Sequence, residues 1–222
     1  MGYIIIYIII VMKIPENQNL NLFILGGIRT CHHYIIEIIA KNMNYNTQIA
    51  NDNGAAFKKN FAISSKRQGF LNDICLFDRE NPNCDTINII NNLKIKNKLK
   101  ILVMRDPFNN WASIKKNDKI SMTFKEWEIN YCNSIFLAEN NLIDLLICYD
   151  LFISNDSYRN DILYQLGVNN EEYKDVLNVT KDGWGSSFSG YKLDNINELL
   201  TRKNSLNEEE IVKIENNKII NC

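Results

Sequence analysis

The sequence predicts an α/β fold in which a parallel sheet is covered by helices. Three segments carry this prediction, because each reads as an apolar strand, a loop and an amphipathic helix: Leu22–Met43, Leu99–Lys116 and Leu145–Leu166. Repeated units of this kind are typical of parallel sheets, whose strands are connected through helices. The chain has 222 residues, of which 45% are hydrophobic, and this fits one globular domain with a sizeable core.

The first unit places a glycine-containing loop between a strand and a helix. Asn21–Leu25 reads as the strand, Gly26–Cys31 (GGIRTC) as the loop, and His32–Met43 has helical apolar spacing. Glycines let a ligand approach the backbone, the helix start supplies N–H groups, and Arg29 supplies positive charge. The loop therefore predicts a phosphate-type anion site. It lacks the Walker A pattern G-x-x-x-x-G-K-[ST] of ATP and GTP sites.

The second unit ends a buried strand with an arginine. The apolar run Ile101–Met104 stops at Arg105 and Asp106, and a helical pattern that carries Ser113 follows. A guanidinium beside the N–H groups of a helix start is suited to binding an anion. Arg105 and Ser113 reach one phosphate only if the strand-to-helix turn folds back. The alternative is that Arg105 pairs with Asp106 and merely ends the strand.

Three further helices are predicted downstream. Thr123–Asn140 has an apolar stripe along one face, and Asp156–Leu166 begins with Asp156 as a plausible N-cap. Ser205–Glu208 has the form of a capping box that opens a last helix. Asn51–Asp73 is polar and without clear periodicity. We expect this segment and its flanking loops to contact a substrate other than the phosphate-bearing ligand.

The two anion-binding segments together resemble the sulfotransferase family, whose donor is 3'-phosphoadenosine 5'-phosphosulfate (PAPS) and whose product is PAP. The family's first motif, roughly P-[KR]-[ST]-G-[TS]-[TS], corresponds to Ile28–His33. Its second motif, R-[DN]-P-x5-S, is met by Arg105-Asp106-Pro107 with Ser113. Weaker matches are Ile147–Leu151, which is similar to the strand-end Y-E-x-L, and Leu199–Ile214, which is similar to the last helix.

This resemblance spans about Leu22 to Ile214 and implies a P-loop-like three-layer sandwich with a central parallel sheet and helices on both faces. It implies that Arg29 faces the phosphosulfate, where charge develops on the leaving phosphate, and that no metal is needed. Arg105 and Ser113 would hold the 3'-phosphate. The expected donor-binding residues are Gly27, Arg29, Thr30, Cys31, His32, His33, Arg105, Ser113, Tyr149, Trp184, Ser186 and Ser187.

Several of these residues have a second interpretation. Arg29 is also suited to capping the turn as an ordinary surface arginine. Tyr149 and Trp184 are suited to stacking on adenine, but an aromatic residue at a strand end is more often part of the core. Gly183–Gly190, within the aperiodic stretch Asn178–Tyr191, is the candidate for a loop that closes over the nucleotide.

The last three positions of the first motif depart from the family. Cys31 stands at the motif glycine, and His32 and His33 stand at two small hydroxyl residues. Either histidine is a candidate catalytic general base, a donor to phosphate oxygens or a packed residue at the helix start. The leading function is a sulfotransferase acting on a hydroxyl or amine acceptor, a carbohydrate among the candidates. The alternatives are a catalytically inactive nucleotide-binding homologue and a P-loop nucleotide kinase-like protein.

The remaining features bound location and partners. Six scattered cysteines without metal-ligand spacing argue against structural zinc and for a reduced, cytoplasmic protein. A net charge of −1 does not indicate a nucleic-acid partner. Residues 3–11 (YIIIYIIIV) are too short for a bilayer span of about 20 residues. We expect one domain over residues 1–222, with residues 1–12 as an apolar leader. The leader either forms an extra strand or precedes the true start of the protein. A membrane anchor is the less favoured alternative.

Overall fold

The computed structural model describes residues 21–32, 34–35, 48–51, 75–94, 96–117, 120–166, 196–218 and 220. The apolar leader and most of the helix predicted over residues 32–43 lie outside the described residues, as do residues 52–74. Within the described part of the chain, none of the helices is both long enough and apolar enough to cross a membrane.

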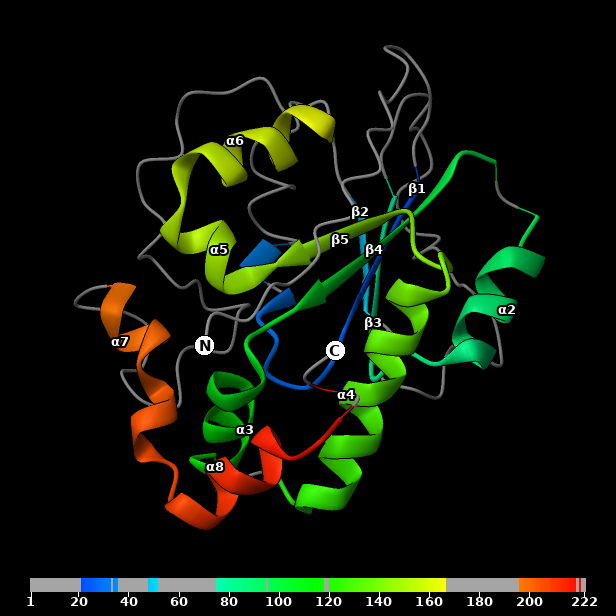
Figure 1. Cartoon of the computed structure of the whole chain (residues 1–222). Helices are drawn as coiled ribbons and strands as arrows, with labels where there is room; N and C mark the ends of the chain where they lie inside the picture. Colours follow the sequence, from blue (N-terminus) through cyan, green and yellow to red (C-terminus); the bar gives the residue numbers. More distant parts are fainter. Residues whose placement is uncertain are drawn as a thin grey trace.

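Five strands form one sheet, and all of its described pairings are parallel (Figure 1). The strand order is β2-β3-β1-β4-β5, so the first strand is central and pairs with β3 and β4. The predicted parallel sheet is confirmed. The sequence did not predict β2 or β3, which border the aperiodic segment. The strands are β1 Asn21–Gly26, β2 Gln48–Asn51, β3 Cys75–Glu80, β4 Lys98–Met104 and β5 Leu145–Cys148.

Helices cover both faces of this sheet, as the resemblance implies. On β1, Leu22 and Ile24 face one apolar cluster, and Phe23 and Leu25 face the other. All four side chains are almost completely buried, which explains why the strand is continuously apolar instead of alternating. The first cluster includes α5 Tyr149–Ser154, α6 Asp156–Gln165 and α7 Ile196–Leu200, and the second includes α2 Cys84–Asn92 and α4 Phe124–Glu139.

A third cluster joins the elements beyond the carboxyl ends of the strands. It packs α3 Pro107–Lys115 and α4 against α8 Glu208–Glu215. Trp111 and Trp127 lie at its centre with their ring centroids 5.5 Å apart. The short 3-10 helix η2 Arg202–Ser205 runs beside α3 (Figure 1). This packing holds α3, which carries Ser113, and η2 next to the loop that follows β1.

The helix boundaries differ from the predicted ones at two places. The N-cap of α6 is Asn155 instead of Asp156, because the Asn155 side chain accepts from Tyr158 N at 3.0 Å. The last capping box begins at Asn207, not at Ser205, and pairs with Glu210. The segment 199–214 is therefore not one helix but the end of α7, then η2, then α8.

Candidate functional site

The loop after β1 packs closely onto itself, and this explains its first glycine. Thr30 donates its N–H and its Oγ1 to Gly27 O at 3.2 and 2.8 Å. Its Oγ1 also lies 3.2 Å from His32 Nδ1. A Cβ on Gly26 would lie 2.5 Å from Thr30 Oγ1 and 2.8 Å from His32 Nδ1, so only glycine fits. His32 is 2% exposed, which favours its packing interpretation over a role as general base. His33 lies outside the described residues.

Two residues of this loop have left-handed backbone although neither is glycine. The φ angles of Arg29 and Cys31 are 64° and 65°. Such angles are uncommon for residues with a Cβ and occur in the backbone nests that bind anions. Cys31 is therefore a side chain at a position with glycine-like backbone, which is where the family motif has glycine. Its Sγ lies 3.9 Å from both Arg29 O and Arg105 Nη1.

Side chains from three distant segments meet at Ser113, whose own side chain is fully buried. Arg29 Nε, from the loop, donates to Ser113 Oγ at 3.3 Å. Arg202 Nη1, from η2, donates to the same oxygen at 3.2 Å. Arg105 does not contact Ser113 in this way but lies beside Cys31 of the loop, with Nη1 3.9 Å from its Sγ. The fold thus gathers Arg29, Arg105 and Arg202 beside one loop, and two of them, Arg29 and Arg202, bind one hydroxyl.

Arg105 is held deeply, at 1% exposure. Its Nη2 donates to Leu199 O at 2.8 Å, and its Nε lies 3.5 Å from Asp150 Oδ1. Burial opposes its charge, but the neighbouring Cys31 and Asp150 outweigh burial and raise its pKa. The pKa of Asp150 is also raised, mainly because the carboxyl group is buried.

The ion-pair partner suggested for Arg105 as an alternative was wrong. Asp106 caps α3 by accepting from Asn109 N at 2.8 Å, and the carboxylate beside Arg105 belongs to Asp150. Asp150 also accepts from Asp106 N at 2.6 Å, so it ties β5 to the turn after β4. Tyr149 is 2% exposed and packs its ring against Tyr34 and Arg105, which favours the core interpretation over stacking on adenine.

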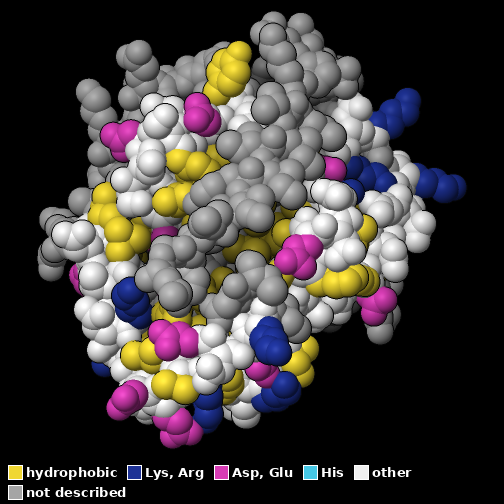
Figure 2. Space-filling view, in the orientation of Figure 1, with side chains coloured by type: hydrophobic (Ala, Val, Ile, Leu, Met, Phe, Trp, Pro, Cys, Tyr) yellow, Lys and Arg dark blue, Asp and Glu magenta, His cyan; other side chains and the backbone are white. Residues whose placement is uncertain are grey.

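The electrostatic balance at the site is positive. Burial, together with the nearby Arg105 and Arg29, lowers the pKa of Arg202 to about 10. A guanidinium with this pKa remains charged at neutral pH, so the described part of the chain brings three cations together at this site. Arg105 and Arg202 are buried, so most of this charge lies inside the protein. On the face shown in Figure 2, cationic and acidic side chains are mixed. Such an arrangement is suited to binding a multivalent anion.

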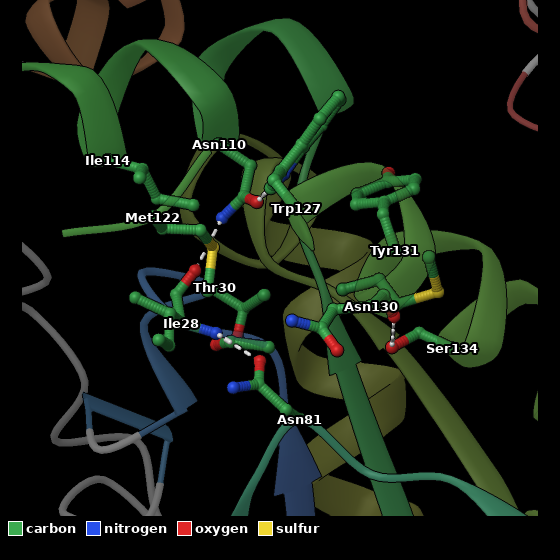
Figure 3. A pocket seen from close by; sticks show the side chains of 12 residues that line it. Ile28, Thr30, Asn81, Asn110, Ile114, Met122, Trp127, Asn130, Tyr131 and Ser134 are labelled. Atoms are coloured by element: carbon green, nitrogen blue, oxygen red, sulfur yellow. Dashed lines mark hydrogen bonds between the residues drawn. The ribbon is translucent and has the colours of Figure 1, made fainter. Parts of the chain in front are cut away.

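A small pocket lies against the loop on the α4 side (Figure 3). Its volume is about 10 Å³, which is room for a water-sized group. The amide of Asn110 lies between Ile28 and Trp127: it donates to Ile28 O at 2.9 Å and accepts from Trp127 Nε1 at 2.7 Å. The pocket wall thus fastens the loop to α3 and α4.

The structure adds one arginine to the predicted set. Arg202 lies in the segment TRKNS, which has no motif and no periodicity that marks an anion site. Its position becomes evident only from the contact with Ser113, 89 residues earlier in the chain. Three predicted donor-binding residues, Trp184, Ser186 and Ser187, lie outside the described residues. The described residues contain no group of three or more His, Cys, Asp or Glu side chains that could hold a metal ion.

Comparison with known proteins supports the fold. No protein-family model matches the sequence, and no curated protein matches it. The crystal structure of mouse sulfotransferase SULT7A1 complexed with PAP is similar, with a TM-score of 0.53 and 9% sequence identity. The match covers 89% of this chain and 83% of the mouse chain. The chain therefore has the P-loop-like α/β fold of the sulfotransferases, as its two motifs predict.

Proposed function

We propose that this protein binds PAPS and transfers its sulfonate group to a hydroxyl or amine acceptor. The observation that carries the proposal is the meeting of Arg29 and Arg202 at Ser113, directly beside a glycine loop with left-handed backbone. The site lies beyond the carboxyl ends of β1 and β4, where open α/β sheets bind ligands. The similar mouse sulfotransferase was crystallised with PAP, which carries two phosphate groups.

Each end of the nucleotide has a proposed binding group. The 5'-phosphosulfate would lie on the loop that contains Gly27 and Thr30, with Arg29 against the bridging oxygen. The 3'-phosphate would be bound by Ser113, Arg105 and the newly found Arg202. Charge-assisted hydrogen bonds of this type contribute about 1.5–3 kcal/mol each. Residues 184–187 remain proposed contacts to the nucleotide.

The proposed reaction is an in-line displacement at sulfur. The acceptor oxygen or nitrogen attacks, its bond to sulfur forms, and the bond between sulfur and the 5'-phosphate oxygen breaks. The electron pair of that bond stays on the phosphate of PAP, where Arg29 stabilises the developing charge. The acceptor proton goes to a general base, for which His33 remains the candidate and His32 is disfavoured by its burial.

A second candidate function is a catalytically inactive PAP-binding homologue. Cys31 favours this alternative, because its side chain occupies the loop at the position of the motif glycine. Such a protein would keep the arginine cluster, and with it nucleotide affinity, without turnover.

Two measurements test the proposal and separate these functions. In a thermal unfolding assay, PAP should raise the Tm much more than ATP with magnesium, because a ligand at 100 times its Kd stabilises by about 2.7 kcal/mol. Turnover with labelled PAPS and a panel of sugars, phenols and lipids then distinguishes the enzyme from the inactive homologue. Equal stabilisation by ATP would support the kinase-like alternative and refute the assignment of the 3'-phosphate.

A further inference from the structure

We propose that Asn109 is a positioning residue that holds Arg202 in the anion site. Asn109 lies in the first turn of α3 and is 4% exposed. Its Nδ2 donates to Leu200 O at 3.1 Å, and its Oδ1 accepts from Lys203 N at 3.0 Å. These two backbone groups lie on either side of Arg202 in the chain. One side-chain amide therefore holds the backbone both just before η2 and within its first turn.

The segment around Arg202 has little stability of its own. Helix α7 has five residues and η2 has four, and helices this short are marginal without external support. The contacts that fasten this segment to the site come from the motif after β4. Arg105 Nη2 donates to Leu199 O at 2.8 Å, and Asn109 binds the next carbonyl and the N–H three residues later. In Figure 1, α7 and η2 run alongside α3.

Arg202 needs such support because its position is electrostatically unfavourable. Its side chain is buried and lies near Arg29 and Arg105, both of which carry the same charge. Burial and this repulsion lower the pKa of Arg202, and a bound anion would offset the repulsion. The two hydrogen bonds of Asn109 act on the backbone and hold the guanidinium at 3.2 Å from Ser113 Oγ. The site is thereby preorganised for an anion before the anion binds.

An amide is the side chain that suits this task. It presents one donor and one acceptor in fixed directions, which match a carbonyl on one side and an N–H on the other. Aspartate has nearly the same shape but cannot donate to Leu200 O, and alanine can make neither bond. Asn109→Ala tests positioning without adding charge, and Asn109→Asp keeps the acceptor, removes the donor and adds a negative charge. An effect common to both variants is not caused by the added carboxylate.

The experiment is a double-mutant cycle on anion binding. Binding of PAP and, separately, of inorganic sulfate is measured by titration calorimetry for the wild type, Asn109→Ala, Asn109→Asp, Arg202→Met and the double variant Asn109→Ala/Arg202→Met. We expect each Asn109 variant to weaken binding about tenfold. We expect Asn109→Ala to have no further effect once Arg202 is methionine, because its effect acts through that residue. Lys203→Met, an exposed side chain beside Arg202, serves as the matched control.

A chemical readout distinguishes positioning from general loss of stability. Phenylglyoxal modification followed by mass spectrometry reports the accessibility of each arginine. Arg202 should react slowly in the wild type and rapidly in both Asn109 variants, while Arg159, which is buried elsewhere, should not change. Retained near-ultraviolet circular dichroism confirms that the variants are folded. If a variant loses its near-ultraviolet signal, the arginine labelling of that variant and of the wild type is compared at a temperature below the unfolding transition of the variant. That comparison then decides whether Arg202 is more accessible in the folded variant.

The outcomes distinguish failure of this inference from failure of the proposed function. Only the titrations with PAP rest on the proposed function. Binding of sulfate but not of PAP would refute the proposed nucleotide site, and the sulfate cycle would still decide the role of Asn109. Additive effects of Asn109→Ala and Arg202→Met would overturn the inference, as would unchanged labelling of Arg202. Absence of any anion binding by the wild type would overturn both proposals.

Discussion

Replacing Arg202 by methionine should stabilise the protein in the absence of an anion. Arg202 is 4% exposed, and its pKa is lowered to about 10, first by burial and then by Arg105 and Arg29. Since one pKa unit corresponds to about 1.4 kcal/mol, the charged side chain lowers the free energy of unfolding by about 3 kcal/mol. Methionine retains most of the apolar volume without the charge, and replacing buried charges in this way is often stabilising.

The sign of this effect follows from proton linkage. The pKa of Arg202 is lower in the folded than in the unfolded protein, so folding disfavours its protonated form. The destabilisation is fully present well below pH 10 and is relieved only as the pH rises above about 10, toward the higher pKa of the unfolded chain. At pH 7.5 it therefore applies in full. Loss of the hydrogen bond to Ser113 offsets about 1 kcal/mol.

The net expectation for Arg202→Met is a gain of about 2 kcal/mol, or roughly 4–8 °C in Tm for a chain of this size. Urea unfolding in a buffer without sulfate or phosphate measures the free energy directly, with Lys203→Met as the control. Saturating PAP should narrow or reverse the difference, because the wild type binds the nucleotide more tightly. A lower unfolding free energy for Arg202→Met in anion-free buffer would refute the reasoning, since it would show that the arginine is a net stabilising contact.

Three further predictions concern the loop and the cysteines. Gly26→Ala should lower the free energy of unfolding by about 2 kcal/mol in urea titrations, because its Cβ would meet Thr30 Oγ1 at 2.5 Å; a wild-type value would mean that the loop relaxes freely. Cys31→Gly suits the φ of 65° and should change stability by less than about 1 kcal/mol while raising PAP affinity in calorimetry; weaker binding would show that the thiol contributes to the site. Partial burial raises the pKa of Cys148 to about 11, so iodoacetamide at pH 8 should alkylate the exposed Cys84 before Cys148 in a mass-spectrometric time course. Equal rates would contradict the raised pKa of Cys148.

The parts of the fold that were predictable from sequence are those with a local signal. A few consecutive residues are enough to predict three of these parts: the continuous apolar run of β1, the glycine loop and the Arg105-Asp106 turn. The strand β3 does not, because CLFDRE mixes apolar and charged residues and becomes a strand through pairing with β1. The paired residues of β1 and β3 are 54 positions apart in the chain, and the apolar periodicity of either segment does not indicate this pairing.

Only those residues of the candidate site that belong to a sequence motif were predictable. Arg29 was expected at the phosphosulfate and Ser113 beside Arg105 at the 3'-phosphate. In the structure the Arg29 side chain itself donates to Ser113. Arg202 was not expected, because what makes it part of the site is the docking of η2 on α3, a tertiary contact made through Asn109. The same holds for Asp150, whose role as the carboxylate beside Arg105 depends on the adjacency of β4 and β5.

The spacing of these residues along the chain has a consequence for how the protein is made. Arg29 precedes Ser113 by 84 residues, and Arg202 follows it by 89, so synthesis delivers the three parts of the cluster at widely separated times. At about 5–20 residues per second, several seconds pass between the appearance of β4 and that of η2. During that interval the nascent sheet can form with Arg29 and Arg105 in place, but the docking surface for η2 on α3 is still uncovered. An anion that binds the docked state would then stabilise the product of the last folding step and slow the undocking of η2, while the earlier collapse of the sheet is unaffected.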